Sequence, residues 1–359
     1  MKNYVQTLCM TLAVAGLGGV LLNFLHMPLS WVLGPIVFLL LYKGLFHKKT
    51  EKSATLQNIA FLLLGIQIGS TFTTDTVNIV TPYFFPFLLF TLLTIFVAIL
   101  SGYFLSKLTK IDKMTSVLGA IPGGLSAMVA MSESFKSNTI YVTLFHSIRL
   151  LAVLFIVPFV ATHFFMDHHR NSSTFLFVED NGHLWTIWIY VLFYIIARLL
   201  DNKVPASYVI IPMLFTAISN SLGLTLFHLP MVLFIAAQII LGANLGHSVS
   251  VEDLKNAGKH CTTYFLLNIV VIAFTFFIGY LFTLLTPMNL VTAILSFAPG
   301  GLVEMAITAQ EVGGDPSIVG SLQMIRLLII VLLLPLILQW ILPKFQKGHE
   351  GKTFIEKSI

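Results

Sequence analysis

The chain has 359 residues, of which 57% are hydrophobic and 10% are charged, and its mean hydropathy is +0.92. Soluble domains contain about 25% charged residues, so this composition excludes an ordinary water-soluble protein. The net charge of +5 comes mainly from Lys and Arg in short loops and in the C-terminal tail. Such charges set the topology of membrane proteins, and we therefore expect no nucleic-acid partner.

Apolar segments follow one another along the whole chain. Several are near 20 residues long, which is enough for a hydrocarbon core of roughly 30 Å at a helical rise of 1.5 Å per residue. We predict an all-α polytopic membrane protein with lipid as a partner. In chain order the predicted segments cover 5–22, 28–43, 56–73, 83–107, 114–135, 138–165, 184–200, 204–223, 230–250, 261–286, 290–312 and 316–342.

Two local features have simple interpretations. The first segment has the character of a signal peptide, but its counterpart at 184–200 is internal, so we expect it to remain as a helix. Cys9 and Cys261 show neither the spacing of a disulfide framework nor that of a metal site. We expect no metal and no cofactor.

The sequence Pro-Gly-Gly-Leu occurs at 122–125 and again at 299–302, so the two copies stand 177 positions apart. Self-similarity at one fixed offset indicates an internal duplication. The same offset relates Pro28 to Pro205, Pro35 to Pro212, Pro158 to Pro335, Gly65 to Gly242, Met128 to Met305 and Arg149 to Arg326. The predicted parts are a first membrane repeat at 1–165, a polar linker at 166–183, a second membrane repeat at 184–342 and a cytoplasmic basic tail at 343–359.

The basic loops have opposite positions in the two halves. In the first half they lie at 43–52 and 107–113, after the second and fourth segments. In the second half they lie at 198–203 and 252–260, after the first and third segments. Because basic loops stay in the cytoplasm, this pattern predicts repeats of inverted topology and cytoplasmic termini.

Inversion requires an odd number of crossings in each half, so one of the six segments must not cross. The fifth segment of each half, 114–135 or 290–312, contains the Pro-Gly-Gly sequence. We therefore predict two inverted repeats of five transmembrane helices, each with a Pro-Gly-Gly re-entrant hairpin or broken helix. A crossing helix kinked at Pro122 or Pro299 is the alternative, but a kink explains neither the paired glycines nor their recurrence.

The predicted site lies where the two broken segments meet. Arg149 and Arg326 stand about ten residues inside their helices, near the bilayer centre, where an uncompensated Arg costs at least about 2.5–3.5 kcal/mol. Two such charges and two helix N-termini favour an anion, most simply a carboxylate. The predicted substrate-binding residues are Gly123, Gly124, Gly300, Gly301, Arg149, Arg326, Gln67 and Asn244, with Pro122 and Pro299 as structural residues of the hairpins.

Coupling to an ion is assigned to Glu304 and His146. Several alternatives stay open. Each Arg can be a structural clamp that pairs with Glu304 or with a hairpin carbonyl, and Glu304 can be a salt-bridge partner instead of a coupling site. Gln67 and Asn244 can serve close helix packing through hydrogen bonds. Two further carboxylates, Glu133 and Glu311, are expected on a solvated rim at the hairpin ends.

The two motifs point to a known family. The stretches IPGGLSAMVAMSESF at 121–135 and APGGLVEMAITAQEVGGDP at 298–316, together with LSWVLGP at 29–35 and an Arg beyond each motif, resemble the AbrB-type duplicated membrane family over nearly the whole chain. Members are often labelled as ammonia monooxygenases, a label that no residue here supports. The family resembles inverted-repeat secondary transporters such as citrate–sodium symporters and bile-acid transporters, which implies a substrate translocator. One departure is Ala127, which stands where the second copy has Glu304.

These features predict a secondary transporter of a small anionic or zwitterionic metabolite, coupled to protons or sodium. A passive channel and a membrane sensor that regulates gene expression are the alternatives. An enzyme is not expected, because no two His stand three or four residues apart in one apolar helix, as a helical metal site requires. We expect a multi-pass protein of the inner or plasma membrane of a bacterium, and a homodimer fits transporters of this hairpin type.

Overall fold

The computed structural model describes residues 2–73, 76, 78, 80–123, 125–135, 137–164, 186–201, 203–224, 226–250, 252 and 258–333. The predicted linker at 166–183 and the tail at 343–359 lie outside the described residues. Within them, the regular elements are all helices, which confirms the predicted fold class at the level of an all-helical membrane protein. Six helices are long and apolar enough to cross a membrane: Tyr4–Phe24, Thr81–Thr109, Thr139–Phe164, Met231–Ser248, Lys259–Thr283 and Pro316–Leu333.

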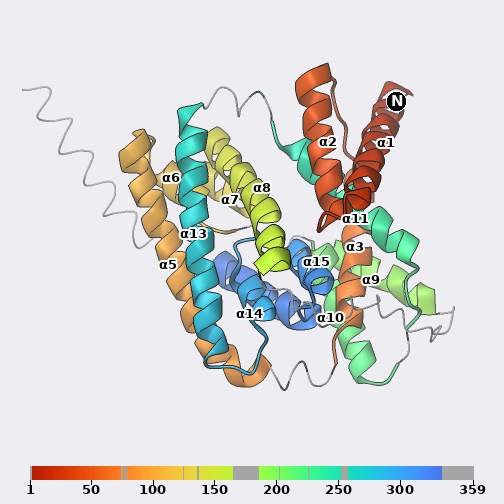
Figure 1. Ribbon diagram of the computed structural model, residues 1–359. Helices are drawn as coiled ribbons and strands as arrows, with labels where there is room; N and C mark the ends of the chain where they lie inside the picture. The colour runs from red at the N-terminus through yellow and green to blue at the C-terminus, as the bar shows by residue number, and fades with distance from the viewer. Residues whose placement is uncertain are drawn as a thin grey trace, which may run out of the picture.

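The described helices form two bundles that lie side by side (Figure 1). In the first bundle, α2 packs against α1 and α11, and α3 packs against α10. Four of its members are apolar helices shorter than a full membrane span. The bounds are Lys2–Phe24 for α1, Ser30–Phe46 for α2, Ala54–Ser70 for α3, Ile187–Leu199 for α9, Ser207–Ser221 for α10 and Met231–Ser248 for α11.

The second bundle contains the other half of each predicted repeat. In it, α13 packs against α5, α8 and α14, while α6 packs against α5 and α8. The helix at 316–333 joins this bundle through apolar residues such as Leu322, which contacts Phe87 and Phe297 in one cluster. The bounds are Thr81–Tyr83 for the 3-10 turn η1, Phe84–Thr109 for α5, Lys113–Ala120 for α6, Leu125–Ser134 for α7, Thr139–Phe164 for α8, Lys259–Thr283 for α13 and Leu290–Phe297 for α14.

One helix, α15 (Leu302–Val312), lies between the bundles (Figure 1). Its residues Leu302 and Ala306 pack in a cluster with apolar side chains of α2, α3, α10 and α11. Its residues Met305 and Ala309 pack instead with side chains of α8 and α14. Apolar residues thus face both bundles, as expected for an element buried between two layers, while Glu304 and Glu311 are its charged residues.

Each Pro-Gly-Gly segment consists of two short helices separated by a break. The first break follows α6 and the second follows α14, because Pro has no backbone N–H to continue a helix. Asn138, after the first segment, donates its backbone N–H to Thr115 Oγ1 near the beginning of α6, at 2.9 Å. Asp315 donates in the same way to Thr292 Oγ1, at 2.9 Å. Each segment therefore ends next to the place where it begins.

The helices α3 and α11, which correspond at the 177-residue offset, each pack on another helix through a glycine. A Cβ atom on Gly65 of α3 would lie 2.5 Å from Val209 O of α10, and one on Gly242 of α11 would lie 2.4 Å from Val32 O of α2. The backbones therefore approach as closely as small residues allow in membrane helices. The two contacts correspond to each other at the 177-residue offset.

The same two helices run in opposite directions. Thr50, which precedes α3, is hydrogen-bonded to Nδ1 of His247 at the end of α11, with 2.8 Å between Thr50 Oγ1 and the ring nitrogen. Lys43 Nζ donates to the carbonyls of Gly246 and His247 at the same place, at 3.1 and 3.0 Å. The helix α3 thus begins at the end of the molecule where α11 ends.

Candidate functional site

Arg149 of α8 closes the first break. Its Nη1 donates to Ile121 O at 2.6 Å, and its Nη2 donates to Gly123 O at 3.3 Å. The break leaves these carbonyls without helical partners, and a guanidinium presents several N–H donors in one plane. The side chain therefore holds the open backbone in a fixed shape.

Arg326 closes the second break with equivalent contacts. Its Nη1 donates to Ala298 O at 2.5 Å and to Phe297 O at 3.3 Å, and its Nη2 donates to Gly300 O at 2.7 Å. Ala298 and Gly300 correspond to Ile121 and Gly123 at the 177-residue offset. The Pro-Gly-Gly elements and the arginines of both halves thus have one geometry in common.

Both arginines carry their charge deep inside the protein. Arg149 is 6% exposed and Arg326 is 5% exposed. Neither forms an ion pair within the described part of the chain. Carbonyl dipoles offset part of this charge, because both guanidinium groups donate to main-chain carbonyls. A buried positive charge without an anionic partner is costly inside a membrane.

Glu304 occupies the N-terminus of α15. It is 7% exposed, and its carboxylate lies so close to Gly301 that a Cβ atom there would be 1.9 Å from Oε2. An acidic side chain in the first turn satisfies free N–H groups and the helix dipole. Glu304 makes no ion pair with Arg326 among the described residues, so the carbonyl clamp is the arrangement that the arginines adopt.

The residues that precede each arginine by one turn differ. Gln323 Nε2 donates to Leu295 O at 2.7 Å and to Ala298 O at 3.2 Å, which adds a second clamp on the second break. His146 stands at the equivalent position and is 3% exposed. Both of its ring nitrogens are buried without a hydrogen-bond partner in the described chain. Its assignment to ion coupling stays a prediction.

The other predicted residues have different surroundings. Gly123 and Gly300 turn their carbonyls toward the arginines, and the N–H of each donates to the residue two positions earlier, at 2.9 and 2.8 Å. Gly124 lies outside the described residues. Gln67 on α3 is half-buried, and Asn244 on α11 has a buried Nδ2 without a partner in the described chain. These two amides belong to the first bundle, while the arginines belong to the second.

Several residues around the breaks were not predicted from the sequence. Tyr264 of α13 donates its hydroxyl to Gly119 O at 2.7 Å and stacks on Phe145, with 4.4 Å between the ring centroids. Its equivalent is Phe87, so the offset gives no signal for it. The hydroxyls of Thr115 and Thr292 did carry such a signal, because they correspond at the 177-residue offset.

Glu311 differs from the solvated rim residue that was expected. Its Oε2 accepts the backbone N–H of Leu29, the residue before α2, at 2.5 Å. This hydrogen bond joins α15 to the first bundle. Glu133, the other carboxylate of this kind, is exposed.

Comparisons with known proteins agree with the resemblance in the motifs. The family model described as "Transition state regulatory protein AbrB" matches residues 1–78 and 31–342. An uncharacterized protein of Bacillus subtilis (strain 168), YhjN, is 26% identical over 347 residues, which cover 90% of each chain. A protein of Escherichia coli (strain K12) that is named as a regulator, AbrB, is 27% identical over 329 residues, which cover 88% of this chain and 91% of the relative. No solved structure matches. The chain belongs to the AbrB family.

Proposed function

We propose that this protein is a secondary transporter of a small anionic or zwitterionic metabolite and has no enzymatic activity. The observation that carries the proposal is that Arg149 and Arg326 are both buried and neither has a carboxylate partner among the described residues. Both stand beside broken backbone, which membrane proteins tolerate only where protein or a water-filled cavity surrounds it. A substrate carboxylate beside a break meets a fixed positive charge.

The two Pro-Gly-Gly segments act in this proposal as re-entrant hairpins that enter from opposite sides. The backbone bonds of Asn138 to Thr115 and of Asp315 to Thr292 support a hairpin shape, because they join the two ends of each segment. The antiparallel course of α3 and α11 supports inverted repeats. Inverted repeats with broken helices at the midplane are the architecture of many secondary transporters.

The distribution of charge supports cytoplasmic termini. Lys43 caps the end of α11 through the carbonyls of Gly246 and His247, and also contacts the carbonyl of Val249. The equivalent contact at the other end of the molecule uses a neutral side chain, because Asn220 Nδ2 donates to Ser70 O at 3.1 Å. A Lys at one end and an Asn at the other fits the enrichment of basic residues on the cytoplasmic side.

Glu304 gives the proposal a coupling group. Its carboxylate covers the N-terminus of α15, whereas Ala127 leaves the N-terminus of α7 without an acidic side chain of its own. A substrate carboxylate is then expected at the first break, and a proton or sodium ion at Glu304. The substrate and the coupling ion thus bind at different breaks.

A sensor that regulates gene expression is the second candidate. The observation that favours it is the description of the family and the name of the Escherichia coli relative, both of which refer to regulation. The two functions differ in a direct way: a sensor binds its ligand without moving it across the membrane. A passive channel moves the ligand without ion coupling.

The experiment combines binding with transport. Purified protein is heated with a panel of carboxylates and amino acids, because a ligand at 100 times its Kd stabilises the folded state by about 2.7 kcal/mol. Hits are then tested for uptake into proteoliposomes with and without a proton or sodium gradient. We expect a carboxylate that raises Tm and accumulates only with a gradient.

Arginine variants localise the site. Arg149→Gln and Arg326→Gln are expected to abolish both the Tm shift and the uptake, and Lys43→Gln, which keeps the two clamps, is the matched control. Uptake that survives Arg149→Gln or Arg326→Gln removes that arginine from the substrate site. A Tm shift without any uptake favours the sensor, and uptake without gradient dependence favours the channel.

A further inference from the structure

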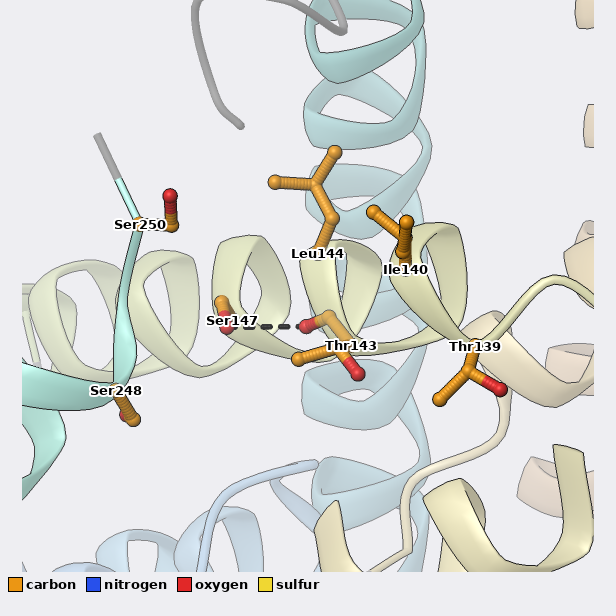
Figure 2. Close-up of a pocket in the computed structure, with 7 residues that line it drawn as sticks. All are labelled: Thr139, Ile140, Thr143, Leu144, Ser147, Ser248 and Ser250. Atoms are coloured by element: carbon orange, nitrogen blue, oxygen red, sulfur yellow. Dashed lines mark hydrogen bonds between the residues drawn. The ribbon is translucent and has the colours of Figure 1, made fainter. Parts of the chain in front are cut away.

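A cavity of about 190 Å³ lies between the two bundles, at the end of the molecule where Lys43 and His247 are located. One wall is the first half of α8, and the other is the end of α11 with the residues that follow it (Figure 2). Drug-sized ligands occupy pockets of roughly 300–1,000 Å³, so this space suits a small metabolite. Its lining combines the apolar side chains of Ile140 and Leu144 with the hydroxyl-bearing residues Thr139, Thr143, Ser147, Ser248 and Ser250.

The hydroxyls of α8 form a line that leads inward. Thr139, Thr143 and Ser147 stand four residues apart and therefore share one face of the helix. The line begins at the first residue of α8 and ends at Ser147, which stands about 200° around the helix from Arg149 and therefore on another face. Ser147 donates its hydroxyl to Thr143 O at 3.0 Å (Figure 2), so the line is preorganised by the helix itself.

The equivalent place at the opposite end of the molecule is closed. Gly320 corresponds to Thr143, and a Cβ atom on Gly320 would lie 3.1 Å from the Ile68 side chain of α3 and 3.8 Å from the Met213 sulfur of α10. The helix at 316–333 thus packs directly on the first bundle where α8 leaves a cavity. Met324, the equivalent of Ser147, packs against the same apolar cluster.

Two polar contacts hold this closed end. Glu311 of α15 accepts the backbone N–H of Leu29 at 2.5 Å, and Ser317 is hydrogen-bonded to Thr76 at 3.0 Å between the hydroxyl oxygens. Each contact joins the second bundle or α15 to a segment next to the first bundle. The molecule is therefore open between its bundles at one end and sealed between them at the other.

We propose that this cavity between α8 and α11 is the cytoplasmic entrance for the substrate, a small carboxylate, and that Thr143 lines its path into the space between the bundles. This inference rests on the proposed transport function. The structure then represents the state open to the cytoplasm, with Glu311 and Ser317 as the outer seal. The Thr143 hydroxyl suits such a path, because it can donate a hydrogen bond to a carboxylate without the tight binding that a charge would add.

The test measures access instead of transport. In a background with Cys9→Ser and Cys261→Ser, single cysteines are introduced as Thr143→Cys and, at the equivalent position, Gly320→Cys. A membrane-impermeant maleimide is added to inside-out or to right-side-out vesicles. We expect Thr143→Cys to react at least tenfold faster in inside-out vesicles, and Gly320→Cys to react from neither side.

Further variants protect the test against misfolding. Ser147→Cys and Met324→Cys repeat the comparison one turn deeper in each helix. Glu311→Gln, combined with Met324→Cys, is expected to raise labelling from the outside, because it weakens the outer seal. The proposed entrance is wrong if Thr143→Cys and Ser147→Cys react equally from both sides or only from the outside.

Failure of the entrance and failure of the transport function give different results. If labelling follows the expected pattern but no carboxylate raises Tm or enters proteoliposomes, the entrance stands and the substrate class is wrong. If a carboxylate is transported but does not slow the labelling of Thr143→Cys, the transport function stands and the entrance is elsewhere.

Discussion

Arg326 holds the second break with three hydrogen bonds, and two of them are 2.7 Å or shorter. Lys carries the same charge, but its donors share one nitrogen and lack the planar fork with which Arg326 spans the break. We expect Arg326→Lys to lower Tm, since each hydrogen bond from a charged group contributes about 1.5–3 kcal/mol. Arg149→Lys removes one short hydrogen bond and one of 3.3 Å, so we expect it to lower Tm by a smaller amount.

Thermal unfolding of the purified variants in detergent measures this difference. Lys107→Arg, in the last turn of α5, is the control for an exchange of basic residues away from the breaks. Equal Tm values for Arg326→Lys and the unchanged protein would show that charge alone, without the bridging geometry, stabilises the break.

Gly301 leaves room for the carboxylate of Glu304. A methyl group at this position would overlap Oε2 and displace the carboxylate from the N-terminus of α15, where an acidic side chain contributes about 0.3–1 kcal/mol. We expect Gly301→Ala to reduce ion-coupled uptake in proteoliposomes as strongly as Glu304→Gln does. The control is Gly16→Ala on α1, because its Cβ meets nothing within 4 Å. The same loss in Gly16→Ala would separate the effect from Glu304.

At the scale of helices, the fold depends on close approach between α3 and α10 and between α2 and α11. A Cβ on Gly65 or Gly242 would lie within 2.5 Å of a backbone carbonyl, which moves only with its whole helix. Overpacking of this kind costs about 1–3 kcal/mol. We therefore expect Gly65→Ala and Gly242→Ala to lower Tm by similar amounts.

Gly16 of α1 provides the matched control. A Cβ at this position meets nothing within 4 Å, and Ala is a better helix former than Gly by about 1 kcal/mol. Gly16→Ala is expected to leave Tm unchanged or slightly higher in the same melting experiment. A Tm for Gly65→Ala that equals that of Gly16→Ala would mean that the helices do not approach as closely as described.

The helices themselves were largely predictable from the sequence, because hydrophobic length and helix breakers are local signals. The predicted segment at 290–312 forms α14 and α15, and its break falls at the Pro-Gly-Gly sequence that predicts it. The family was predictable for a similar reason, since resemblance to a family follows contiguous motifs. The inverted repeats and the roles of the site residues stay predictions.

The contacts of the site were less accessible to sequence reasoning. Glu311 binds a backbone N–H of Leu29, which is 282 positions away, and no pattern of residue types encodes a partner that is a main-chain group. From the sequence, Arg149 and Arg326 could pair either with a carboxylate or with a hairpin carbonyl, because a guanidinium donates hydrogen bonds to both. Only the packing of the bundles selects the carbonyls.

At the scale of the whole molecule, the distribution of polar contacts determines which loops share a side of the membrane. Thr50 and His247 join the loop before α3 to the end of α11. Tyr4 donates its hydroxyl to Lys52 O at 2.8 Å, which brings the N-terminal helix to the same end. The described residues Lys43 and Lys52 therefore lie at this end of the molecule, where the positive-inside tendency acts on them as a group.

This arrangement makes a prediction about topology that needs no substrate. Reporters fused after Lys49 and after Lys255 are expected to face the cytoplasm, and a reporter fused after His228, between α10 and α11, is expected to face the outside. The helices α3 and α11 correspond at the 177-residue offset. In a parallel duplication they would run in the same direction, and the Lys49 reporter before α3 and the Lys255 reporter after α11 would then lie on opposite sides. Reporter activity in intact cells distinguishes the two, and opposite sides would contradict the inverted repeat together with the two-sided approach of the Pro-Gly-Gly segments.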